Sequence, residues 1–123
     1  MKIFKDDTPI YLQLRKQIEE SILIGAMTAE GAVPSLRQMA KDYGINPLTV
    51  SSAISALVDE GILYRKRGIG VFVSTGAREK IIKTRSSAFL EETLDPVLKS
   101  AKQLEIPKQL ILERLNALYG EKS

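Results

Sequence analysis

The sequence contains no cysteine, no histidine and no tryptophan. Without cysteine and histidine there are no disulfides, thiolate nucleophiles or imidazole bases, and nearly every zinc, copper or haem site is excluded. No apolar run approaches the roughly 18 residues that span a bilayer, and residues 1–9 are polar rather than signal-like. We therefore expect a cytoplasmic protein with no membrane partner, no metal and no cofactor.

The residues that remain for catalysis are poorly placed. Adjacent carboxylates occur at Glu19-Glu20 and at Glu91-Glu92, but neighbours on a helix diverge by about 100° and do not converge as an acid and a base must. Gly68-Ile69-Gly70 lacks the third glycine and the following helix of a dinucleotide-binding turn. We expect no enzyme.

The composition is typical of a folded chain. Its 123 residues are 44% hydrophobic and 27% charged, and the formal net charge is only +3. A polyanionic partner would therefore be held by a local cluster of cations rather than by the total charge. The acids leave room for such a cluster, because Asp42 is the only one in residues 35–58.

Residues 9–61 carry the apolar periodicity and the start and stop signals of three helices. The last two are separated by a very short turn that contains glycine, which is typical of a helix-turn-helix. The start and stop residues are Pro9 and Gly25, Ser35 and Gly44, and Asn46-Pro47 and Gly61. The expected inward residues are Ile10, Leu14, Ile18 and Ile22, then Leu36, Met39 and Ala40, then Val50, Ala53, Ile54 and Leu57.

A β-hairpin follows these helices. Residues 62–66 and 71–74 are β-prone and are separated by Arg67-Gly68-Ile69-Gly70, whose two glycines can adopt the positive φ of a tight turn. Because a two-stranded ribbon is marginal alone, its apolar side chains Leu63, Val71 and Val73 should lie on the helices. The pattern predicts a winged helix-turn-helix.

Residues 77–123 are again periodic in the manner of helices, with a second start at Pro107 and a kink or break expected at Pro96. The apolar stripe can fold back on the winged part or pair with a second chain, and a two-fold partner is the commoner solution. The expected fold is mainly α with a small β-hairpin: a winged helix-turn-helix domain over 1–76 and a two-helix dimerisation hairpin over 77–123. The expected dimer contacts are Phe89, Leu90, Leu94, Leu98, Ala101, Leu104, Ile111, Leu115 and Leu118.

Three features favour a nucleic-acid partner. The outer face of the third helix carries small or hydroxyl side chains, which can approach a phosphate chain closely, and it has no carboxylate before Asp59. Arg65, Lys66 and Arg67 lead into the hairpin turn, where a minor groove would attract them. Arg37 lies early in the second helix, which crosses the backbone in such pairs. The outer-face residues are Thr49, Ser51, Ser52, Ser55 and Ala56.

With these features the chain resembles the GntR family of bacterial transcription regulators, and specifically its short YtrA-like branch. The matching blocks are Pro9-Ile10-Tyr11-Leu12-Gln13-Leu14, Pro34-Ser35-Leu36-Arg37-Gln38-Met39-Ala40, Gly44-Ile45-Asn46-Pro47-Leu48-Thr49-Val50, Glu60-Gly61-Ile62-Leu63 and Arg67-Gly68-Ile69-Gly70-Val71-Phe72-Val73. The resemblance implies a transcriptional repressor that binds double-stranded DNA as a dimer. An unidentified small-molecule effector would be a further partner. It places at the DNA Ser35, Arg37, Asn46, Leu48, Thr49, Ser51, Ser52, Arg67, Gly68 and Gly70, beside the Lys66 of the basic triplet.

One departure from the family pattern affects this interpretation. Many relatives carry Lys or Arg after the Thr-Val pair, where this chain has Ser51-Ser52. Since Arg to guanine is the commonest specific contact, we expect fewer direct base contacts and more reliance on phosphates, Arg37 and the wing. The alternative is a winged helix that serves only protein interaction or dimerisation. RNA is a more distant candidate, because a helix shaped for a B-form major groove cannot enter that of A-form RNA.

Overall fold

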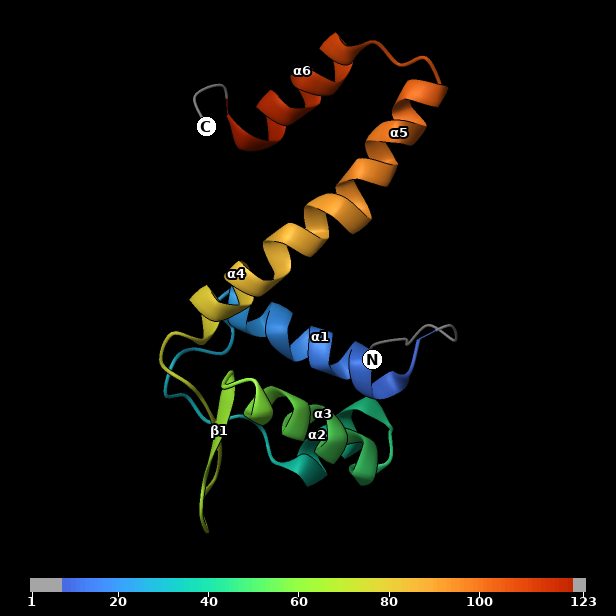
Figure 1. Cartoon of the computed structure of the whole chain (residues 1–123). Coiled ribbons are helices and arrows are strands. Elements are labelled where there is room, and N and C mark those ends of the chain that lie inside the picture. Colours follow the sequence, from blue (N-terminus) through green and yellow to red (C-terminus); the bar gives the residue numbers. More distant parts are fainter. Residues whose placement is uncertain (1–7, 121–123) are drawn as a thin grey trace. The chain divides into compact units, whose positions relative to one another are not determined.

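The computed structural model describes residues 8–120, so most of the polar start of the sequence, residues 1–7, lies outside the described part (Figure 1). The chain forms two compact units, Met1–Thr84 and Arg85–Ser123, and the division falls within α4. The expected fold class, mainly α with one small hairpin, is confirmed. Its elements are α1 (Ile10–Leu23), α2 (Leu36–Tyr43), α3 (Pro47–Asp59), β1 (Leu63–Lys66), β2 (Gly70–Val73), α4 (Ala77–Ala88), the π-helical η1 (Phe89–Leu94), α5 (Asp95–Gln103) and α6 (Lys108–Tyr119).

The first unit is built around α3, which packs against α1, α2 and β1. The predicted stripe of α3 is fully buried, and the other buried apolar residues come from α1, the loop before α2, α2 itself, the hairpin with the residue that precedes it, and the start of α4. One expected core residue is wrong: Ile10 is 42% exposed. It is the first residue of α1 and lies one turn beyond Leu14, the first buried residue of that helix.

Two side chains fix the helix-turn-helix locally. The Ser35 hydroxyl accepts a hydrogen bond from the amide of Gln38 at 3.0 Å, and Oδ1 of Asn46 accepts one from the amide of Leu48 at 2.8 Å. Between these caps Gly44 takes a φ of 66°, a left-handed conformation that costs glycine nothing. The predicted starts of α2 and α3 are confirmed, and the caps set the direction in which α3 leaves the turn.

The hairpin pairs β1 with β2 in antiparallel register from Leu63 opposite Val73 to Lys66 opposite Gly70. Leu63 and Val73 are buried, as the apolar pattern predicts. The loop before α2 adds a third line of pairing, since Val33 donates to the carbonyl of Val71 at 2.8 Å and Val73 donates to that of Gly31 at 2.9 Å. The wing is therefore held on its β2 side by a segment that the sequence patterns describe only as a loop.

In the second unit, helical residues continue without a break from Arg85 to Gln103, and α6 follows a short loop. Of the kink or break expected at Pro96, the break does not occur. The wider π-helical turn of η1 ends just before Pro96, which removes the close approach of its ring to the carbonyl four residues earlier. None of residues 85–120 is buried, and only Leu94, Ala101 and Ile111 are half-buried.

Candidate nucleic-acid interface

The first part of the candidate interface is the beginning of α3. Leu48 is 76% exposed there, Ser52 is exposed, and Thr49 and Ser51 are half-buried. The Ser52 hydroxyl donates to the carbonyl of Leu48 at 3.1 Å, so its oxygen stays available as an acceptor. The first turns of α2 and α3 contain no acidic residue. The helix starts can therefore attract an anion with their amides and their partial positive charge.

The second part is the tip of the wing. The amide of Ile69 donates to the carbonyl of Lys66 at 2.9 Å, and Gly68 has a φ of 76°, as in a type II turn. Gly70 has a φ of 150°. The predicted positive φ of both glycines is confirmed, and the chain reverses at the tip in a narrow turn.

The cations of the wing have different environments. Arg65 donates to the Ser55 hydroxyl on α3 at 3.0 Å, which ties the hairpin to the candidate recognition helix. The Lys66 ammonium lies 5.0 Å from the centroid of the Phe72 ring, within cation–π range. Among the described residues Arg67 has no hydrogen-bonding or ionic partner and stands exposed. Of the three wing cations, Arg67 is therefore the one whose N–H donors are all available to a ligand.

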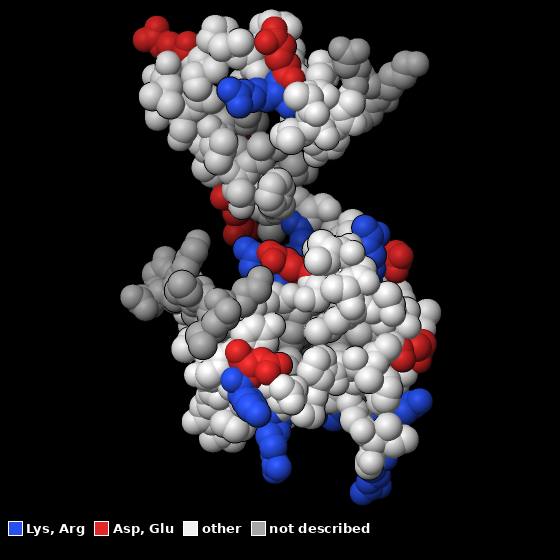
Figure 2. All heavy atoms as spheres, turned by 180° about the vertical axis from the view of Figure 1, so that it is seen from behind, with Lys and Arg blue, Asp and Glu red and all other residues white. Residues whose placement is uncertain are grey.

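Arg37, in the first turn of α2, is likewise exposed and has no such partner in residues 8–120. Figure 2 shows Lys and Arg side chains projecting from the end of the first unit that carries the wing. The Asp and Glu side chains on this face of the unit lie farther from that end. The first unit therefore presents a basic edge although the whole chain is nearly neutral.

The Glu30 carboxylate is the centre of a hydrogen-bonded group next to the hairpin. The Glu30 carboxylate accepts hydrogen bonds from the Thr75 hydroxyl, at 2.6 Å, and from the Tyr64 hydroxyl. These two bonds, with Thr75 the larger cause, lower the pKa of Glu30 below its usual 4.5, and the bond to Glu30 raises the pKa of Tyr64. Glu30 also has a φ of 67°. Through these two hydrogen bonds Glu30 connects β1 to the segment between β2 and α4. No local sequence signal indicates this connection.

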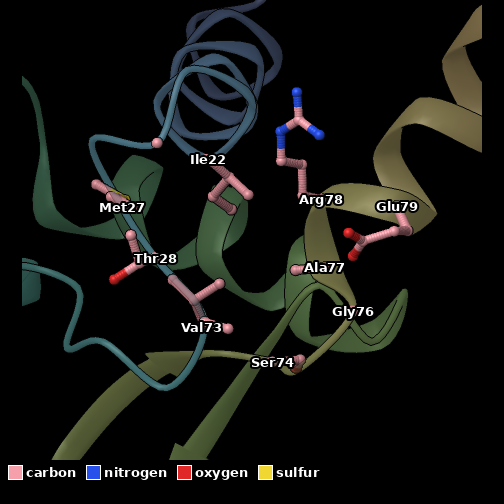
Figure 3. A pocket seen from close by; sticks show the side chains of 11 residues that line it. Ile22, Met27, Thr28, Val73, Ser74, Gly76, Ala77, Arg78 and Glu79 are labelled. Atoms are coloured by element: carbon pink, nitrogen blue, oxygen red, sulfur yellow. The ribbon is translucent and has the colours of Figure 1, made fainter.

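A cavity of about 210 Å³ in the first unit is lined by the end of α1 and the loop after it, the end of β2 and the start of α4 (Figure 3). Ile22 and Val73 are among its apolar lining residues, and Arg78 borders it while donating from Nε to the carbonyl of Leu23 at 2.9 Å. Small-molecule pockets are typically about 300–1,000 Å³. This cavity is smaller than that range, so we do not assign an effector to it.

The structure places every residue predicted to contact DNA at the surface or half-buried, on the starts of α2 and α3 and on the wing tip. Ser35 and Asn46 also cap their helices, as predicted for both from their positions before α2 and α3. The missed features are the Arg65–Ser55 link and the 72% exposed Ile69 at the tip. The residues predicted for the dimer contact are exposed or half-buried in the single chain: Phe89, Leu90, Leu94, Leu98, Ala101, Leu104, Ile111, Leu115 and Leu118.

Comparison with known proteins matches residues 10–73 to the model of the family described as bacterial regulatory proteins, gntR family. The chain is 37% identical over 114 residues to the HTH-type transcriptional repressor NagR of Bacillus subtilis, covering 91% of this chain and 46% of that protein. It is 34% identical over 88 residues to the HTH-type transcriptional repressor YtrA of the same species, covering 72% of this chain and 68% of that protein. The chain thus spans about half the length of NagR.

Solved structures give the same result. A transcriptional regulator from Oenococcus oeni has a TM-score of 0.73 at 25% identity, with 98% of each chain covered. YtrA from Sulfolobus acidocaldarius, a GntR-family transcription factor, has a TM-score of 0.58 at 32% identity, covering 72% of this chain and 95% of that one. The DNA-binding domain of AraR, in complex with operator ORX1, has a TM-score of 0.54 at 27% identity, covering 60% of this chain and 90% of that one.

The helix-turn-helix and the paired wing form a winged-helix domain like that of these relatives, which are named as regulators of transcription. The chain belongs to the GntR family of bacterial regulatory proteins, which confirms the predicted family and its YtrA likeness. The relatives named above are transcription regulators, and DNA binding is the property that the family implies. Between residues 8 and 120, none of the helices has the length and apolarity that crossing a bilayer requires.

Proposed function

We propose that the protein is a sequence-specific repressor that binds double-stranded DNA as a homodimer on a pseudo-palindromic operator. The observation that carries this proposal is the surface shared by the starts of α2 and α3 and the wing tip: it is free of acids in both first turns and offers two uncommitted guanidinium groups, Arg37 and Arg67. Hydroxyls, free helix amides and arginines are the groups that bind phosphates and base edges.

In this proposal α3 enters the major groove from its N-terminal end, as in other helix-turn-helix proteins. Ser35 and Arg37 contact phosphates from the start of α2, and the wing tip contacts the minor groove. From α3 the contacts come from Asn46, Leu48, Thr49, Ser51 and Ser52, and from the wing they come from Lys66, Arg67, Gly68 and Gly70. The Arg65–Ser55 hydrogen bond supports the arrangement, because it restrains the hairpin against α3.

Base readout in this arrangement is modest. The start of α3 offers hydroxyls and one exposed leucine instead of an arginine. Leu48 suits the methyl group of thymine, and the Ser52 oxygen can accept from an amino group of cytosine or adenine. Much of the affinity would then come from phosphates and from the shape of the DNA, which makes binding strongly dependent on salt.

Dimerisation through residues 77–123 follows from the apolar surface of that segment. The second unit buries none of its described residues, while Phe89, Leu90 and Leu104 are more than half exposed. A chain of this size rarely leaves such a stripe in water, and a two-fold partner covers it at both copies at once. Two recognition helices roughly 34 Å apart would match half-sites one helical turn apart. A small-molecule effector would then bind in a pocket formed by the two chains.

Selection of the purified protein on a random duplex library, near physiological salt and with excess competitor DNA, tests the proposal. We expect a two-fold symmetric motif. Arg37→Ala and Arg67→Ala should each weaken binding to the selected duplex, whereas Arg114→Ala, which removes an exposed cation of α6, should not. Failure to enrich any motif would favour a winged helix that acts only in protein interaction or dimerisation.

A further inference from the structure

The wing tip carries an apolar side chain that the fold itself does not use. Ile69 is 72% exposed, although its own amide closes the turn by donating to Lys66. Gly68 and Gly70 flank it, and a Cβ at either position would meet no atom within 4 Å. The isoleucine therefore projects from a narrow backbone with no bulk on either side of it.

We propose that Ile69 is an apolar wedge that inserts from the minor groove between two base pairs beside each half-site. The proposal rests on the proposed function, since it needs the wing to lie on DNA. Isoleucine is among the side chains that architectural proteins insert between base steps, where it replaces base stacking by contact with an apolar surface. The two bare glycines let the backbone follow the side chain into a narrow groove.

The surrounding charge favours DNA over a protein as the occupant. Arg65, Lys66 and Arg67 precede the tip within the same hairpin, and all three are exposed. A protein partner that covered Ile69 would also remove water from these cations, at a cost that only matched acids could offset. A duplex covers the isoleucine with bases while its phosphates pair with the cations. The same loop thus offers both of the interactions that a minor groove provides.

Insertion of a wedge has two consequences for the DNA. The duplex bends, typically by about 20–90° for side chains of this kind. The affected step should be one that unstacks easily, such as TA or CA/TG, so the operator should show a preference at a position where no hydrogen bond is made to a base. This would supply part of the specificity that the serine-rich face of α3 does not.

Duplexes carrying the selected motif and a fluorophore at each end test the wedge, since energy transfer reports the bend and titration reports the affinity. We expect Ile69→Ala to weaken binding on the order of tenfold for each half-site, because it withdraws most of a buried aliphatic side chain, and to abolish the bend. Ile69→Leu should keep both. Ile69→Lys should lose the bend even though it adds a cation. Ile24→Ala is the matched control, as Ile24 is 80% exposed at the end of α1, outside the proposed contact.

The outcomes separate the wedge from the proposed function. If Ile69→Ala bends and binds the duplex as the wild type does, the wedge is refuted while the repressor proposal stands. If Ile69→Lys binds more tightly with the bend unchanged, the tip acts by charge and the wedge is again refuted. If the wild-type protein selects no duplex, the proposed function fails and this inference fails with it.

Discussion

Leu98→Asp should split the dimer while leaving the winged unit folded. Leu98 lies on α5 and is 39% exposed in the single chain. Covering the exposed part of a leucine is worth about 1 kcal/mol, and an unpaired carboxylate in the same contact costs a further ~1–3 kcal/mol. Two-fold symmetry repeats the change on both chains, so the dimer should lose about 4–8 kcal/mol, a factor of at least about a thousand in Kd.

Sedimentation equilibrium over a range of protein concentrations measures this Kd directly. Ile24→Asp is the control, because it places the same charge on an isoleucine that is 80% exposed in the first unit and outside the proposed contact. Leu98→Asp should also weaken binding to the selected duplex, since one chain engages a single half-site. A Leu98→Asp protein that dimerises with the wild-type Kd would refute the assignment of the dimer contact to this face.

Three further predictions concern the first unit. Asn46→Ala removes the cap of α3 and should cost about 1 kcal/mol in urea unfolding, so an unchanged midpoint would argue against the capping role. Leu57 is fully buried, and Leu57→Ala should cost ~2–5 kcal/mol in the same assay; a loss well under 1 kcal/mol would mean that the core is packed otherwise. Because the pKa of Glu30 is lowered on folding, the stability from its hydrogen bonds is present above pH 4.5 and is lost as the pH falls through the folded pKa. In an NMR titration Thr75→Val should raise that pKa more than Tyr64→Phe does, and the opposite order would contradict the assigned causes.

The local features of the first unit could be predicted because their signals are local. Ser35 and Asn46 stand directly before apolar stripes, and their side chains cap the helices that those stripes form. The buried face of α3 follows from its periodicity, and the hairpin turn follows from Gly68 and Gly70. Ile10 continues the apolar stripe of α1 and is exposed nonetheless, because periodicity does not tell where along a helix the packing partner ends.

The remaining features depend on residues far apart in the sequence. Glu30 accepts a hydrogen bond from Thr75, which lies 45 positions further along the sequence. Its positive φ could not be predicted either, because glutamate is not a residue type that favours this conformation. The pairing of Ala32 with Phe72 gives the loop before α2 the role of a third strand. The exposure of Ile69 likewise depends on the geometry of the turn, since an isoleucine between glycines can equally point inward. Such contacts require the fold before they can be recognised.

The dependence of duplex affinity on salt tests the central claim, that the α3 and wing surface binds DNA, most directly. For the selected duplex, the logarithm of the binding constant should fall linearly with the logarithm of salt concentration, by about 0.9 for each phosphate neutralised. Arg67→Ala should make the slope shallower by about 2, because a dimer presents the residue twice, and Arg114→Ala should leave it unchanged. A binding constant that does not respond to salt, or the same slope with and without Arg67, would contradict the account.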